Sequence, residues 1–248
     1  MLAAIRSEFR KLLTVRSTYF ITGLSLLIVM FFAGFIEGFR GSVGSLSTNP
    51  GLLASESTNA IVFVGFLLAF VGLLLAGHEY RYNTIMYTLT ATNRRYKVLL
   101  AKFVAVTVFA TAVSLLVVFF APLCTIVGAA LAGKEMGAQQ FDVWSIVWRC
   151  VFVGWGYSMY AFVLMMIMRN QIGAIITFLL LPLMGESILS VLLKENAKNL
   201  PFTSLQSVIA PMDAANHVTS GHQALVVVVY VVVGLLVSFV LFQKRDAN

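Results

Sequence analysis

Six segments of this chain are apolar over the length that a membrane-spanning helix needs. About 20 mostly apolar residues, rising about 1.5 Å each, cross the hydrocarbon core of a bilayer. The last segment contains Val226 to Val229 and would favour a strand in water. In lipid only a helix or a closed barrel satisfies the backbone, so a helix is predicted there too. The predicted spans are Thr18–Ile36, Ile61–Ala76, Val98–Phe120 or Val98–Leu131, Val143–Met168, Ile172–Leu193 and Ala224–Phe242.

The composition excludes a water-soluble globular protein. Hydrophobic residues make up 60% of the chain and charged residues 11%, whereas soluble domains are about 25% charged. The only cysteines, Cys124 and Cys150, cannot build a disulfide framework and are interpreted as small apolar residues. We therefore expect residues 1–248 to form one all-α polytopic transmembrane domain without a soluble domain.

Basic residues are distributed unequally between the two sides of the predicted membrane. Loops on the cytoplasmic side of a membrane are enriched in Lys and Arg. This rule predicts a cell (inner) membrane protein with both termini in the cytoplasm. The net charge of +7 then reflects topology and contact with anionic membrane lipid, and no nucleic-acid partner is expected. Predicted inside are Arg6, Arg10, Lys11, Arg16, Arg81, Arg94, Arg95, Lys97, Lys102, Arg169, Lys244 and Arg245; predicted outside are Arg40, Lys134, Lys194 and Lys198.

Two segments outside the spans have apolar residues at helical spacing. Residues 1–16 are predicted to form an amphipathic helix at the cytoplasmic interface, and the alternative is a simple basic flank of the first span. Residues 194–222, on the outer side, contain Pro201 and Pro211 and are predicted to include a short re-entrant helix. The apolar positions are Leu2, Ile5, Phe9, Leu12 and Leu13 in the first segment and Phe202, Leu205, Val208 and Ile209 in the second.

Residues 79–97 form the longest polar and basic interruption between two spans. Tyr82, Ile85, Met86 and Leu89 follow helical spacing and predict a short amphipathic helix. A turn at residues 91–93 then precedes the basic pair that begins at Arg94. A two-residue turn would be enough to join neighbouring spans, so this segment suggests a docking site. The alternative is an ordinary interfacial helix held by lipid headgroups.

No pattern in the chain indicates catalysis. Gly128 to Lys134 matches the start of a phosphate-binding loop, but Glu135 stands where Ser or Thr would hold magnesium. We therefore expect no enzyme activity, no catalytic residue and no metal site in this chain. Gly34 and Gly38 form a GxxxG pattern, which lets two helices approach closely.

The segment after the second span resembles the corresponding segment of ABC type-2 (ABCG-like) transporter permeases. Their loose pattern there is Glu, Gly-Thr, a hydrophobic pair, Pro-x-Ser-Arg, and a Lys at the start of the third span. Asn83 stands here where Gly is usual, and Ala91 where Pro is usual. The N-terminal helix with Glu8 and Lys11, the six spans and the outer segment also agree with the family. The matching residues are Glu79, Thr84, Leu89, Arg94 and Lys102.

This resemblance implies the membrane subunit of an ATP-driven exporter. The partners would be a separate P-loop ATPase, present in two copies and binding ATP and magnesium, and a second permease subunit in a homodimer or heterodimer. The alternative is a channel or secondary transporter not driven by ATP. The resemblance implies that the permease is coupled to the ATPase through Glu79, Tyr82, Thr84, Ile85, Met86, Leu89 and Arg94.

Two ionisable residues lie within the predicted spans. Arg149 and Glu186 each fall about six or seven residues from the outer membrane boundary, which is roughly 10 Å deep at 1.5 Å per residue. A charge facing lipid at that depth is costly. We therefore expect the two side chains to pair, as a structural clamp or as part of an exit pathway.

Overall fold

A computed structural model describes residues 2–40, 52–82, 84–87, 95–134, 143–209 and 220–244. These residues form helices and contain no strand. Six helices are long and apolar enough to cross a membrane, so the prediction of an all-α multi-pass membrane protein is confirmed. The elements are α1 (Leu2–Thr14), α2 (Arg16–Val29), η1 (Met30–Arg40), α4 (Leu52–Arg81), α6 (Arg95–Leu131), α7 (Val143–Met168), α8 (Gln171–Leu180), η2 (Leu181–Gly185), α9 (Glu186–Leu193), η3 (Lys194–Asn199), α10 (Pro201–Ile209) and α11 (Ser220–Lys244).

The six candidate spans match the predicted ones in order and number; five are longer than predicted, and the fourth is shorter because it begins at Ile146 instead of Val143. The second span is longer than predicted because α4 continues to Arg81, into the polar segment that follows it. The third takes the longer predicted alternative and ends at Leu131. The spans are Arg16–Arg40, Ala60–Arg81, Tyr96–Leu131, Ile146–Met168, Gln171–Leu193 and Gly221–Gln243.

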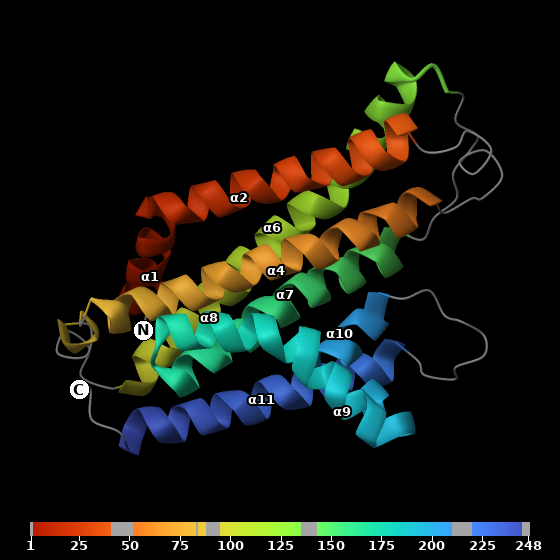
Figure 1. Ribbon diagram of the computed structural model, residues 1–248. Coiled ribbons are helices and arrows are strands. Elements are labelled where there is room, and N and C mark those ends of the chain that lie inside the picture. The colour runs from red at the N-terminus through yellow and green to blue at the C-terminus, as the bar shows by residue number, and fades with distance from the viewer. Residues whose placement is uncertain are drawn as a thin grey trace.

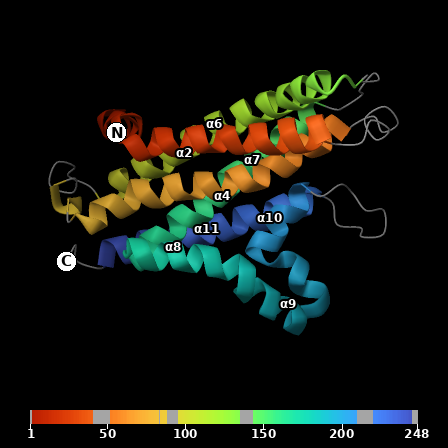
Figure 2. The ribbon, with the colours of Figure 1, turned by 45° about the horizontal axis from the view of Figure 1, so that its top comes forward.

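The spans run side by side in one bundle (Figure 1). α1 turns away from α2 at a steep angle and lies across the bundle end where α4 ends and α6 begins (Figures 1 and 2). We call this the α1 end. The C-terminal end of α11 lies there too, while α9 and α10 lie toward the opposite end (Figure 1).

Helices α4 and α7 form the centre of the bundle. The apolar window of α7 is 72% buried, whereas that of the α8–α9 span is 11% buried. Close approach of α4 and α7 requires glycine, since a Cβ at Gly72 would lie 2.7 Å from the Ser158 carbonyl oxygen. Because the α8–α9 span is so little buried, most of its surface is left to lipid or to another chain.

The first span continues beyond Val29 as the π-helical segment η1, which packs against α6. A Cβ at Gly38 would lie 2.6 Å from the Thr125 carbonyl oxygen, and one at Gly128 would collide with the carbonyl of Gly34. The GxxxG pattern therefore serves a contact within the chain. At the end of η1, Nζ of Lys134 donates to the carbonyl oxygens of Gly38 and Phe39 at 2.9 and 2.7 Å.

We expect Gly128→Ala to destabilise the protein by about 1–3 kcal/mol, the usual cost of overpacking. The added methyl group has no room because it meets backbone atoms of η1, which cannot rotate away. Thermal unfolding in detergent measures the change. Gly23→Ala is the matched control, because a Cβ there meets nothing within 4 Å. Equal melting temperatures for the two variants would contradict the packing of η1 on α6.

Candidate functional site: a buried ion cluster between three helices

Four charged side chains from three helices meet at the α1 end of the bundle. Glu8 and Lys11 come from α1, Glu79 from the last turn of α4, and Lys102 from the second turn of α6. We call these four residues the ion cluster. It contains two carboxylates and two ammonium groups, so its formal charge is zero.

Each lysine of the ion cluster bridges both carboxylates. Nζ of Lys11 lies 2.6 Å from Oε1 of Glu8 and 2.5 Å from Oε1 of Glu79. Nζ of Lys102 lies 2.9 Å from Oε2 of Glu8 and 2.9 Å from Oε1 of Glu79. It also lies 3.4 Å from the carbonyl oxygen of Leu75. The four side chains therefore form a closed ring of ion pairs that ties α1, α4 and α6 together.

Burial makes the ring hard to break. The side chains of Lys102, Glu8 and Glu79 are 2%, 3% and 7% exposed. A charge removed from water at such a site is tolerated only when opposite charges and hydrogen bonds compensate it. Among the described residues, Oε2 of Glu79 still has no hydrogen-bond partner. Loss of any one member would leave a net charge of one unit on the remaining three.

Lys11 is the most exposed member, with 36% of its side chain accessible. Burial disfavours its ammonium form, but hydrogen bonds with Glu79 and Glu8 outweigh this effect and raise the pKa of Lys11 above its usual 10.5. A raised pKa means that the charged Lys11 stabilises the folded state. This stabilisation is fully present at a pH below the pKa in the unfolded state, and it is lost as the pH rises through the pKa in the folded state. Lys11 therefore remains charged at neutral pH.

The structure places the predicted coupling residues in three different settings. Glu79 and Tyr82 lie at the end of α4, and Glu79 belongs to the ion cluster. The chain then turns, with the Thr84 amide donating to the Glu79 carbonyl oxygen at 2.9 Å. Ile85 is 4% exposed, whereas Tyr82 and Met86 are 64% and 49% exposed. Of the predicted apolar stripe, Ile85 thus packs inside the chain, while Tyr82 and Met86 are accessible. Leu89 and Arg94 lie outside the described residues.

Sequence reasoning singled out the members of the ion cluster separately but did not join them. The charge distribution counts Lys11 and Lys102 among the basic residues of the cytoplasmic side, and the structure pairs both with carboxylates. The sequence did contain a signal for ion pairs at the α1 end. Glu8 and Glu79 are carboxylates beside apolar segments on a side otherwise rich in cations, where each requires a basic partner.

At the opposite end of the bundle, Glu186 has a different partner from the one expected. Its carboxylate accepts hydrogen bonds from the amides of Phe202 and Thr203 and from the Thr203 hydroxyl, each at 2.7 Å. Pro201 begins α10 without needing a partner for its nitrogen, and the exposed N–H groups of a helix start favour an anion. Glu186 thus caps α10, and no ion pair between it and Arg149 occurs among the described residues.

Arg149 is half-buried on α7, and its guanidinium carbon lies 5.8 Å from the ring centroid of Trp148. Its Nε is buried and has no hydrogen-bond partner in the described part of the chain. Glu186 is drawn to α10 instead because three donors converge there, and α10 also inserts Phe202 against Phe178 and Tyr160. The expected pairing of Arg149 with Glu186 is therefore replaced by a helix cap.

We expect Lys102→Met to destabilise the protein by about 3–5 kcal/mol, the usual cost of breaking a buried ion pair from one side. The substitution leaves Glu8 and Glu79 with Lys11 as their only cation in the ion cluster. Thermal unfolding in detergent measures the loss. Lys97→Met is the control, because Lys97 lies on α6 outside the cluster. Adding Glu8→Gln to Lys102→Met should recover part of the loss, and full additivity of the two changes would argue against the ring.

We expect Glu186→Leu to destabilise the protein more than Glu186→Gln, because leucine leaves three donors without an acceptor. Each unsatisfied buried donor costs about 1–3 kcal/mol. A double-mutant cycle with Arg149→Leu, read by thermal unfolding, tests the assignment of partners. If Arg149 and Glu186 have separate partners, the two changes in the free energy of unfolding should add to within about 0.5 kcal/mol. A coupling well above that value would restore the pair expected from sequence.

The family comparison covers most of the chain. The family model described as "Protein of unknown function (DUF2705)" matches residues 19–247. The match includes Glu79 and Lys102 of the ion cluster, whereas Glu8 and Lys11 precede it. A comparison with curated proteins gave no match. With so much of its 248 residues matched, the chain belongs to the family described as protein of unknown function DUF2705.

Proposed function

We propose that this chain is the permease subunit of an ATP-driven ABC exporter. Hydrolysis of ATP, bound with magnesium by a separate P-loop ATPase, would drive the spans between inward-open and outward-open arrangements. The proposal rests on the resemblance of residues 79–97 to the coupling segment of ABC type-2 permeases. The observation that best supports it is the ion cluster, which joins this segment to α1 and α6.

Mechanical coupling requires that a push on a surface segment reaches the spans without being absorbed by local bending. Glu79 stands at the start of the segment and Lys102 shortly after its end. Their 2.9 Å ion pair closes the segment at its base, and Glu8 and Lys11 attach α1 to the same point. A force on residues 80–97 would therefore reach α4 and α6 together, and α4 packs directly against the central helix α7.

The accessible side chains of the segment suit a protein partner. Tyr82, Met86 and Tyr87 are 64%, 49% and 77% exposed. Aromatic residues and methionine are enriched at the centres of protein interfaces. In this proposal the α1 end faces the cytoplasm, in keeping with the basic residues there. α1 lies along the membrane surface, the residues around α10 form the outer segment, and a second permease subunit completes the pathway.

We expect Leu89→Asp to abolish copurification of the proposed P-loop ATPase partner, because a carboxylate cannot enter an apolar groove without a partner. Arg94→Ala should weaken the complex less, since a charge at an interface rim contributes less than a buried anchor. Affinity purification of the coexpressed proteins, followed by native mass spectrometry, gives the readout. The wild-type complex should contain two permease and two ATPase subunits.

Leu131→Asp is the matched control, because it introduces the same carboxylate at a 76% exposed leucine at the opposite end of the bundle. It should leave the ATPase bound. If Leu89→Asp also leaves the complex intact, residues 79–97 do not dock the ATPase. Transport that continues unchanged in ATP-depleted vesicles would favour the channel or secondary transporter instead.

A further inference from the structure

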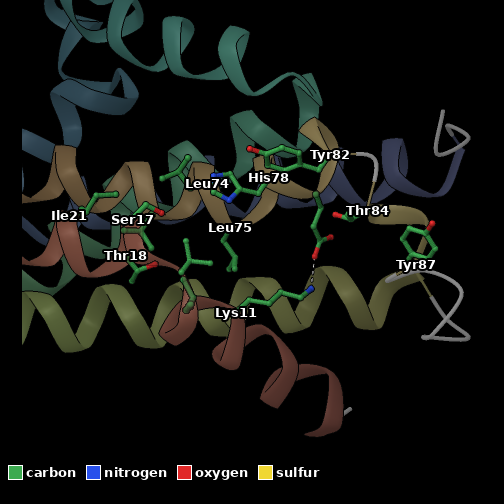
Figure 3. Close-up of a pocket in the computed structure, with 14 residues that line it drawn as sticks. Lys11, Ser17, Thr18, Ile21, Leu74, Leu75, His78, Tyr82, Thr84 and Tyr87 are labelled. Carbon is green, nitrogen blue, oxygen red and sulfur yellow. Dashed lines mark hydrogen bonds and ion pairs between the residues drawn. The ribbon is translucent and has the colours of Figure 1, made fainter.

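A cavity of about 460 Å³ opens beside the ion cluster. Helices α1, α2 and α4 and the residues just after α4 form its walls (Figure 3). A cavity lined by apolar residues with a few polar groups at one end is typical of a ligand site. Neither the ion cluster nor the proposed coupling segment requires such a space, because both could pack closely without it.

The cavity changes character along the bundle axis. α2 runs away from the α1 end and α4 returns to it, so Ile21 and Val71 lie deepest among the lining residues of these helices. Figure 3 places Ile21 beside Ser17 and Thr18 of α2, Leu74 and Leu75 in the middle of the cavity, and Tyr82, Thr84 and Tyr87 toward the bundle end. An occupant therefore needs an apolar part directed into the membrane and a polar part at its surface.

The polar end of the cavity favours an anion. The Lys11 ammonium has three N–H donors, of which the carboxylates of Glu8 and Glu79 take two. His78 also lines the cavity and offers an imidazole N–H. Lysines already pair with both oxygens of Glu8 and with Oε1 of Glu79, while Oε2 of Glu79 has no partner among the described residues. The exposed Arg16 and Arg81 lie next to lining residues in the chain. A phosphate group is the anion that membranes supply at this depth.

We propose that this cavity binds an anionic phospholipid. One acyl chain lies between α2 and α4, against Ile21, Val71 and Leu74, and the phosphate lies at the mouth beside Lys11 and His78. The lipid then occupies the angle between α1 and the bundle, next to the ion cluster. The assignment concerns binding alone and does not depend on the proposed exporter function.

A photoreactive phosphatidylglycerol with a diazirine on one acyl chain tests the site. The full-length protein is placed in phosphatidylcholine nanodiscs that contain a small fraction of this probe, irradiated and analysed by peptide mass spectrometry. We expect adducts on residues 17–21 and 71–75 that unlabelled phosphatidylglycerol removes and added phosphatidylcholine does not. Adducts spread evenly over lipid-facing helices, or removed equally by both lipids, would overturn the proposal.

A cavity-filling variant gives an independent test. Leu74→Trp places a larger side chain in the apolar part of the cavity and should eliminate the adducts on residues 17–21. Leu116→Trp is the control, since Leu116 lies on α6 away from the cavity and is 45% exposed. If Leu74→Trp retains these adducts at the wild-type level, the proposal is wrong. Should this variant fail to fold, the lipid competition on the wild-type protein decides the question alone.

Discussion

The compensation of buried charge is the constraint on which the α1 end of this protein depends. Three of the four ion-cluster side chains are less than a tenth exposed. Removing them from water is costly, and only their mutual contacts offset that cost. An apolar replacement of all four would hold the helices together as well. A ring of charges differs in that it permits one arrangement of α1, α4 and α6, because any displacement separates an ion pair.

Much of the fold was predictable because lipid simplifies the problem. Backbone groups in a bilayer must bond within their own helix, so length and apolarity alone locate the spans. All six predicted spans occur in order, and even the Val-rich sequence of α11 is helical. The bounds were less predictable, because polar residues end a hydropathy window but do not end a helix. Glu79 and Arg81 thus continue α4, where composition indicated a loop.

The candidate site was less predictable, since it depends on contacts between residues far apart in sequence. Glu8 and Lys11 are spaced for one helix face, but nothing local indicates that Lys102 reaches Glu8 across 94 positions. The Glu186 prediction shows the same limit. Depth in the membrane correctly implied that this carboxylate needs a partner, yet depth alone does not distinguish a side-chain cation from the backbone amides of a helix start. Those amides reach Glu186 because α10 packs on α7 and α8, where Phe202 contacts Tyr160 and Phe178.

The two ends of the bundle use the same physical device for different purposes. At the α1 end, buried carboxylates hold a helix outside the spans by ion pairs; at the other end, the buried Glu186 holds α10 by its amides. The four ion pairs tie α1, α4 and α6 to one another, so a displacement of one of these helices is passed on to the other two. The Glu186 cap accepts hydrogen bonds from two amides and a hydroxyl of α10, and α10 also packs against α7. In the proposed exporter, we therefore expect α1 and the segment after α4 to move with the proposed ATPase partner, while α10 stays with α7.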